Sequence, residues 1–264
     1  MTHTVYLAEV INTKDENQNQ KSIKYPDSVP LIQNLKQFEF ENRITIICGD
    51  NGSGKSTLIK GIAEQLGAHK IDGLSYQTDV RLYDFLKLRT RRKPKRTFHF
   101  TGEDFIRYIE WLEKTKQESR EAIDEINEHY GEDSYSAMLA RQPHERTIGD
   151  INHMYEGRLS QQSHGEGFLN FFRSRLIKDG LYLIDEPESA LSYENQYVIS
   201  MLIRDAASEG AQFIIATHSP IITGIPEADL FEIKDGKLIK TDYDSLENIQ
   251  FLNLFIRKRK YLFE

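Results

Sequence analysis

Residues 49–56 read Gly-Asp-Asn-Gly-Ser-Gly-Lys-Ser, and this segment constrains the fold more than any other part of the chain. The run before it, Arg43–Cys48, is β-branched and apolar and predicts a strand. The segment after it, Ser56–Leu66, has the pattern of a helix that ends at Gly67. A glycine-rich loop between a strand and a helix is typical of a phosphate-binding loop. Its four specified positions would coincide by chance in a chain of this length only roughly 1% of the time.

The residue types in this loop indicate how it would hold a nucleoside triphosphate. The glycines let the backbone curl so that N–H groups point at phosphate oxygens, and the following helix adds its positive N-terminal end. Lys55 would supply a point charge, and the Ser56 hydroxyl would complete the oxygen coordination of Mg²⁺. We therefore predict ATP and Mg²⁺ as cofactors. The expected nucleotide-binding residues of the loop are Asp50, Asn51, Gly52, Ser53, Gly54, Lys55, Ser56 and Thr57.

Two more predicted strands end in polar side chains. Leu181–Ile184 runs into Asp185 and Glu186, and Phe213–Ala216 runs into a segment that contains His218. The carboxyl ends of parallel strands line the ligand crevice, so these side chains are expected beside the phosphate loop. We predict that Asp185 holds Mg²⁺ together with Ser56, that Glu186 activates the attacking water, and that His218 reaches the γ-phosphate. The predicted catalytic residues are Glu186, His218 and Lys55.

Strands alternate with helices over most of the chain, which predicts an α/β fold with a mainly parallel central sheet covered on both faces. The alternation stops near Glu103, where apolar residues recur at the spacing of an amphipathic helix as far as Tyr130. Pro143, Gly149 and Gly157 then predict several short helical pieces rather than one long helix. We therefore expect a nucleotide-binding core formed by residues 1–102 and 180–264. A helical lobe would occupy residues 103–179.

The order and spacing of these motifs resemble the ABC-type ATPase superfamily, and within it the small stand-alone ATPases related to the RecF, OLD and SMC heads. This resemblance covers most of the chain and implies a P-loop NTPase fold with an antiparallel N-terminal β portion. It also identifies residues 163–167 as similar to the signature loop, in which Ser163 and Gly165 would contact ATP bound to a second subunit. Ser189–Ser192 resembles the loop that faces this partner. The resemblance thus implies a homodimer that closes on two ATP molecules.

The chain departs from that superfamily at two places, and a third feature, the adenine contact, has only one candidate. The signature-like loop has His164 and Glu166 where the common pattern is LSGGQ. Many relatives carry a glutamine after the strand that precedes the helical lobe, but Phe98–Glu103 contains none, and Gln77 lies earlier. Tyr25 is the upstream candidate for stacking on adenine, although a tyrosine beside a proline is also typical of a turn.

The charge distribution limits the choice of partners. Lys and Arg number 34 against 41 Asp and Glu, a formal charge of -7 that argues against a protein coating nucleic acid over its whole surface. Arg81–Arg96 nevertheless holds eight basic residues and one acid, densest over Arg89–Arg96. This segment would contact a nucleic-acid backbone, form a solvated loop, or turn its arginines toward the bound triphosphate. The short run Arg257–Lys260 predicts an exposed helix face.

The sequence also gives an expectation for location. Its start lacks the basic and apolar regions of a signal peptide, and no apolar run approaches ~18 residues. We therefore expect a cytoplasmic protein without a membrane contact. Cys48 ends an apolar run, which predicts a buried and inert thiol.

Taken together, these features predict an Mg²⁺-dependent ATPase that converts ATP to ADP and phosphate. The expected reaction cycle closes and reopens a homodimer and acts on nucleic acid or on a partner protein, as in repair or phage defence. Two alternatives remain open: a switch that uses ATP mainly to dimerise and regulates a partner protein, and the nucleotide-binding subunit of a transporter. The atypical signature loop and the missing glutamine argue against the transporter.

Overall fold

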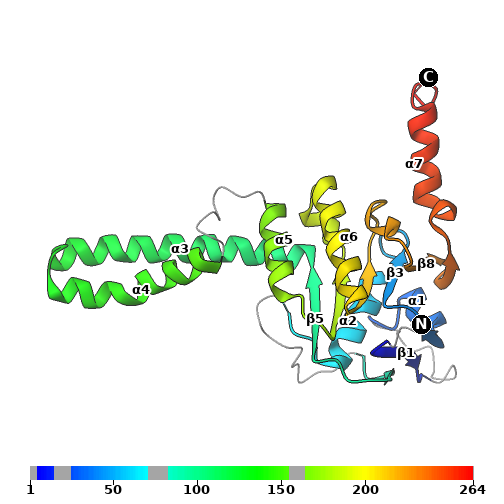
Figure 1. The fold of residues 1–264 in the computed structure, drawn as a ribbon, viewed down its shortest axis with the longest axis horizontal. Coiled ribbons are helices and arrows are strands. Elements are labelled where there is room, and N and C mark those ends of the chain that lie inside the picture. The colour runs from blue at the N-terminus through cyan, green and yellow to red at the C-terminus, as the bar shows by residue number, and fades with distance from the viewer. Residues whose placement is uncertain (1–4, 15–24, 71–82, 155–163, 264) are drawn as a thin grey trace.

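The computed structural model describes residues 5–14, 25–70, 83–154 and 164–263, and its central element is a six-stranded sheet (Figure 1). The strand order is β5-β6-β7-β3-β8-β9. The first five strands run parallel, and β9 pairs antiparallel with β8. These strands are β3 (Ile44–Cys48), β5 (Arg96–Thr101), β6 (Gly180–Asp185), β7 (Gln212–Ala216), β8 (Asp229–Lys234) and β9 (Lys237–Thr241).

A second sheet contains the N-terminal strand and is antiparallel. β1 (Leu7–Asn12) lies between β2 (Gln37–Glu39) and β4 (Leu86–Thr90). Gln212 at the start of β7 joins the two sheets, because its side-chain oxygen accepts from the backbone N–H groups of Tyr6 and Leu7 while its amide donates to the Leu7 carbonyl. The predicted α/β fold with an antiparallel N-terminal portion is confirmed. β2 and β4 were missing from the sequence prediction.

Alternating side chains of the buried strands divide the core into two layers. On one face Ile46, Phe100 and Ile215 pack with residues from α3, α5 and α6. On the other face Ile47 and Ile214 pack with α2 and with the three-stranded sheet. The helices are α1 (Pro30–Asn34), α2 (Lys55–Leu66), α3 (Gly102–Tyr130), α4 (Tyr135–Met154), α5 (His164–Arg175), α6 (Tyr193–Ser208) and α7 (Glu247–Lys258), with short 3-10 turns η1 (Pro187–Ala190), η2 (Ile222–Gly224) and η3 (Tyr243–Ser245).

Helices α3 and α4 form an antiparallel pair that extends away from the sheets (Figure 1). The prediction that Pro143 and Gly149 break this region into short pieces was wrong, because α4 continues through both residues. A proline inside a helix removes one backbone hydrogen bond. Packing on α3 offsets that loss, and the two helices are tied by hydrogen bonds from Arg141 to Asn127 and from Lys116 to Asn152, each 2.6 Å long. Gly157 lies outside the described residues.

The division into a core of residues 1–102 and 180–264 and a lobe of 103–179 stays a prediction. Cys48 is buried as expected, and burial raises the pKa of its thiol to about 12, which fits an unreactive side chain. Within the described ranges, no helix is long and apolar enough to cross a bilayer.

Candidate active site

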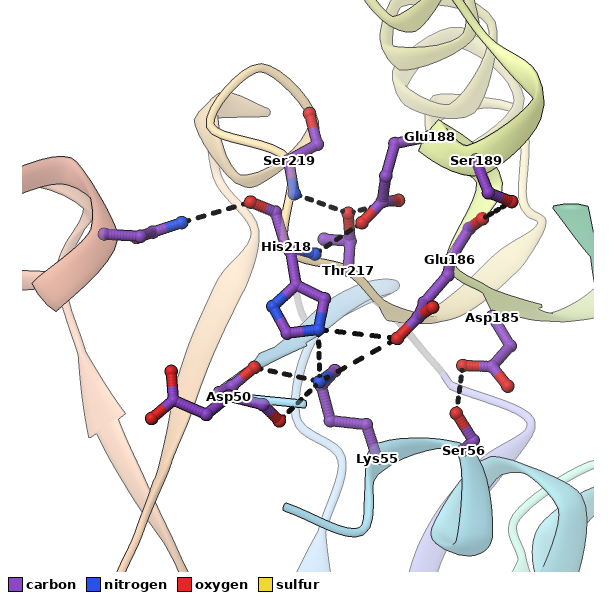
Figure 2. Close-up of polar contacts among 12 residues, drawn as sticks. Asp50, Lys55, Ser56, Asp185, Glu186, Glu188, Ser189, Thr217, His218 and Ser219 are labelled. Carbon is purple, nitrogen blue, oxygen red and sulfur yellow. Dashed lines mark hydrogen bonds and ion pairs between the residues drawn. The ribbon is translucent and has the colours of Figure 1, made fainter. Parts of the chain in front are cut away.

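Three neighbouring strands of the large sheet end at the same edge and bring together the residues predicted from separate parts of the sequence. β3 leads into the loop before Lys55, β6 ends at Asp185, and β7 leads to His218. Figure 2 shows Lys55, Glu186 and His218 pointing toward one another from these three elements. The parallel register places the three strand ends side by side, as expected for a ligand site in an open α/β sheet.

The loop from β3 to α2 has backbone geometry that requires glycine. Gly49, Gly52 and Gly54 have φ angles of 149°, 78° and 104°. A Cβ on Gly54 would also come within 2.6 Å of the Val29 side chain, so this position is closed to larger residues on steric grounds as well. Gly52 faces open space, and Asp50 and Asn51 are exposed. The tip of the loop is therefore free to approach a ligand.

Lys55 lies at the centre of this site, and only 3% of its surface is exposed. Its ammonium nitrogen is 2.8 Å from the Gly49 carbonyl oxygen, 3.0 Å from that of Asp50 and 2.7 Å from His218 Nε2. Glu186 Oε1 lies 4.0 Å from the same nitrogen and 3.4 Å from His218 Nε2. Burial lowers the pKa of Lys55, and the charges of Glu186 and Asp185 act in the opposite direction.

The three close contacts of Lys55 fix the tautomer of His218. An ammonium group has three protons, and two carbonyl oxygens with one imidazole nitrogen accept all three. With Lys55 as the donor, His218 Nε2 acts as the acceptor and the ring proton is assigned to Nδ1. When the Lys55 ammonium turns toward a negatively charged group, His218 Nε2 loses its hydrogen-bond donor and becomes available to a new partner. The Lys55–His218 contact thus couples the loop to the end of β7.

Asp185 and Ser56 form an oxygen-rich corner beside this cluster. The Ser56 hydroxyl donates to Asp185 Oδ1 at 3.0 Å, and Asp185 is 5% exposed. Burial raises the pKa of Asp185 to about 6, with the hydrogen bond from Ser56 acting against it. The hydroxyl oxygen of Ser53 is also buried without a hydrogen-bond partner among the described residues. A hydroxyl and a carboxylate are the donors that Mg²⁺ prefers, so the residues present fit this ion.

Replacing Asp185 with asparagine is expected to stabilise the nucleotide-free protein at pH 7.5. Because the pKa of the Asp185 carboxyl is raised in the folded state, the folded protein loses stability as pH rises from the unfolded-state pKa of 3.8 through the folded-state pKa of about 6. Asparagine removes that penalty, worth about 1–3 kcal/mol, and its side-chain oxygen still accepts from Ser56. Urea unfolding at pH 7.5 and pH 4 measures the effect, which should disappear at pH 4. A lower stability of the variant at pH 7.5 would contradict this account.

Glu188 is a site residue that the sequence prediction missed. Its carboxylate accepts from the Thr217 hydroxyl at 2.7 Å and from the His218 backbone N–H at 2.5 Å, so it links η1 to the turn that holds His218 (Figure 2). Thr217 in turn accepts from the Ser219 N–H at 3.0 Å. The second acid in Glu186-Pro187-Glu188 was the available signal, because it lies three residues after the end of β6.

The junction between the sheet and the helical lobe touches the acidic strand end. Gly102 starts α3, and a Cβ there would lie 2.6 Å from the Glu186 carbonyl oxygen and 2.0 Å from Ser189 Oγ. A cavity of about 340 Å³ opens here, between Asp185 on one side and the first turn of α3 on the other. This turn holds Glu103 and Asp104 at the place where the resemblance implied a glutamine. The absence of that glutamine from Phe98–Glu103 therefore puts carboxylates, rather than an amide, beside the cavity.

Several predicted residues are placed elsewhere or lie outside the described part of the chain. Gly165 is in the first turn of α5, whereas Ser163 and Gln77 lie outside the described residues. The Tyr25 hydroxyl is 2.9 Å from the Tyr83 hydroxyl, and stacking of its ring on adenine stays a prediction. Thr57 is buried in the first turn of α2.

The described part of the basic segment runs from β4 in the three-stranded sheet to the start of β5, at the edge of the six-stranded sheet opposite Lys55. Arg96 begins β5, which reaches the site only at its other end, where Thr101 pairs with Asp185. The alternative that these arginines face the bound triphosphate is therefore wrong for residues 89–96. Arg89 pairs with Glu9 at 2.6 Å and Lys95 with Asp179 at 3.3 Å, whereas 91–93 form an exposed turn.

The fold and this cluster define a P-loop nucleotide-binding protein. Residues 62–223 match the model of a family described as AAA ATPase domain, and this range is more than half of the chain. The chain therefore belongs to that family, binds ATP and is an ATPase, and the resemblance to ABC-type ATPases is confirmed. The phosphate loop itself lies just before the matched range.

Curated relatives are similar over most of the chain. The energy-coupling factor transporter ATP-binding protein EcfA of Methanosphaera stadtmanae is 25% identical over 82% of this chain and 75% of its own length. The ABC transporter ATP-binding protein YtrE of Bacillus subtilis is 26% identical over 80% of this chain and 88% of its own. Yeast VMR1, an ABC transporter ATP-binding protein/permease, is 28% identical over 84% of the chain, which spans only 14% of that protein.

Solved structures with a similar arrangement include a nucleotide-free ATP-binding cassette from an ABC transporter. It is 17% identical, with a TM-score of 0.49, and the match covers 94% of this chain and 95% of that one. The SMC head domain from Thermotoga maritima is 15% identical, with a TM-score of 0.44 and coverage of 90% and 98%.

Proposed function

We propose that this ATPase is Mg²⁺-dependent, closes as a homodimer around ATP, and couples hydrolysis to an action on nucleic acid. The observation that carries the catalytic part is the meeting of Lys55, Glu186 and His218 within 4.0 Å, beside the Ser56–Asp185 corner. These side chains come from three strand ends, so the fold itself holds them together. Steady-state ATP turnover with Mg²⁺, and after its removal by a chelator, tests the metal requirement.

Each side chain has a role that follows from its environment. In hydrolysis the oxygen of the attacking water would form a bond to the γ-phosphorus as the bond to the ADP oxygen breaks, and Glu186 would take the water's proton. Lys55 would exchange its carbonyl partners for phosphate oxygens, and Ser56 and Asp185 would hold Mg²⁺, which would screen the phosphate charge. Glu186, whose side chain is 41% exposed, can take a proton from water, since water reaches it while Asp185 stays buried. His218, released by Lys55, would present Nε2 to the group that reacts and so orient it.

The homodimer would complete the open side of this site. Ser189 and Ser192 are exposed beside Glu186, and the Ser189 hydroxyl donates to the Glu186 carbonyl at 2.8 Å. A partner that contacts this loop would therefore act directly on the position of Glu186. Ser163 and Gly165 are the proposed contacts to ATP across the interface. Sedimentation of a turnover-deficient variant with and without ATP tests this closure.

Reversing the charge of the exposed turn at Arg91, Arg92 and Lys93 is expected to weaken DNA or RNA binding at low salt by about tenfold or more. Each phosphate neutralised by a basic side chain releases counterions, and three lost contacts remove that gain. Fluorescence anisotropy with single-stranded DNA, duplex DNA and RNA measures the effect. ATP turnover should rise with the nucleic acid that binds, and only in the parent protein.

A matched control reverses three exposed basic residues elsewhere: Lys114, Arg204 and Lys237. This variant has the same net charge as the test variant, so a patch-specific effect should leave its binding near that of the parent. An equal loss of nucleic-acid binding in both variants would show that net charge, rather than the exposed turn, causes the effect. Unchanged binding in the test variant would refute the patch.

The transporter alternative rests on a different observation, since EcfA and YtrE, which are similar over about four-fifths of the chain, carry transporter names. In that second candidate function the chain would be a nucleotide-binding subunit whose turnover responds to a membrane partner. Indifference of turnover to every nucleic acid, together with co-purification with a membrane protein, would favour it over the first.

A further inference from the structure

Helix α7 has an apolar face that is largely exposed, although the Phe263 ring contacts Phe255 on it. Phe251 is 65% exposed, Ile256 is 64% exposed and Leu252 is 38% exposed, and Ile249 is the one buried residue of this helix. Positions 251, 252, 255 and 256 fall on one side because the helix repeats every 3.6 residues. Figure 1 shows α7 standing away from the sheets, on the side opposite α3 and α4. Large apolar side chains gathered on an exposed face mark an interaction surface.

The two ends of α7 carry opposite charges. The segment that leads into α7 is acidic, with Asp242, Asp244 and then Glu247, which pairs with Lys234, and the last turn of the helix and the residues after it are basic, with Arg257–Lys260. Glu247 and Lys258 are eleven residues apart, which is about three helical turns, so they flank the apolar face on the same side. A helix with this pattern is complementary to a second copy of itself that runs in the opposite direction.

We propose that α7 is a dimerisation helix that packs antiparallel against α7 of a second copy of this chain. A twofold axis level with the middle of α7, on its apolar face, sets Phe251 of each copy against Ile256 of the other and brings the acidic start of each helix near the basic end of its partner. Such an interface is isologous, so one surface serves both partners. An anionic membrane surface matches the helix less well, because the acidic start of α7 would be repelled from it.

The α7 pairing would lie close to the nucleotide site, but it would use a different surface of the protein from the one proposed to meet the partner when ATP closes the homodimer. The Asn248 side chain donates to the His218 carbonyl at 3.2 Å, and Glu247 pairs with Lys234 at 2.8 Å. The start of α7 is thereby fixed beside His218, while Phe251 and the residues after it face outward. The α7 dimer needs no nucleotide, and its existence is independent of whether ATP closes a second interface.

Sedimentation velocity of the full chain without nucleotide, from about 1 to 100 µM, tests this proposal. The parent protein is expected to sediment as a dimer. Phe251→Asp should raise the dimer dissociation constant at least about tenfold, because it places a charge in the centre of the apolar face. Asn253→Asp is the matched control: it adds the same charge to the exposed polar side of α7 and should leave the constant within about twofold.

Further variants separate this interface from folding defects and from ATP-driven closure. Ile256→Asp should act like Phe251→Asp, and an unchanged far-UV circular dichroism spectrum shows that each variant folds. Lys55→Ala should keep the dimer, since no nucleotide takes part in it. A parent protein that is monomeric at about 100 µM overturns the proposal. Binding of that monomer to vesicles containing anionic lipid would assign the face to a membrane instead.

Discussion

Replacing Glu186 with glutamine is expected to lower ATP turnover by about 100-fold or more while ATP binding is retained. Glutamine has nearly the same shape as glutamate, so the contacts around Lys55 and His218 change little in geometry. It cannot accept a proton from water, and general-base assistance of this kind contributes about 10²–10⁴ in rate. Turnover is measured by phosphate release under saturating Mg²⁺ and ATP, and binding by titration with a fluorescent ATP analogue.

The same variant should accumulate the ATP-bound homodimer, because closure continues while hydrolysis is blocked. Glu209→Gln, at an exposed acid after the end of α6, is the control and should keep the parent rate. Turnover that is equal in Glu186→Gln and in the parent would remove Glu186 from the proposed role. In a Phe251→Asp background, which removes the proposed α7 dimer, a Glu186→Gln variant that hydrolyses slowly but stays monomeric with ATP would retain the base and reject the closure.

The site residues that could be predicted are marked by their immediate neighbours in the sequence. The loop up to Lys55 could be predicted because a strand, four constrained positions and a helix follow one another directly in the sequence. Asp185, Glu186 and His218 were predictable for a related reason, since buried parallel strands are continuous apolar runs and their polar ends are conspicuous. The rule that these ends share one edge then placed them beside the loop, and the distances around Lys55 agree with that placement.

The parts that could not be predicted depend on contacts between distant segments. Glu188 is defined by its bonds to Thr217 and His218, about 30 residues away, and its position near the end of β6 marks it as a candidate without indicating these partners. β2 and β4 are short strands whose existence depends on pairing with β1. In α4, local propensity at Pro143 argued for a break, and the packing of the helix on α3 overrode it.

Replacing Lys55 with alanine is expected to weaken MgATP binding by at least about 100-fold, the largest effect on affinity of any single change in this chain. The ammonium group is buried, so its interaction with phosphate is little screened by solvent, and no other cation among the described residues contacts the Gly49 and Asp50 carbonyls. Isothermal titration calorimetry measures the loss. Lys237→Ala, which removes an exposed lysine from the start of β9, should bind as the parent does.

Thermal unfolding distinguishes this loss of binding from a loss of folding. Ligand that binds only the folded state raises the melting temperature, so saturating MgATP should stabilise the parent and leave Lys55→Ala unchanged. Burial disfavours the charged form of Lys55. Replacing Lys55 with alanine therefore removes a desolvation penalty, and this gain offsets part of the stability lost with the packing of the side chain. The nucleotide-free variant should therefore melt within a few degrees of the parent. A variant that melts far lower without nucleotide, yet still gains stability from MgATP, would show that Lys55 supports the loop rather than the phosphates.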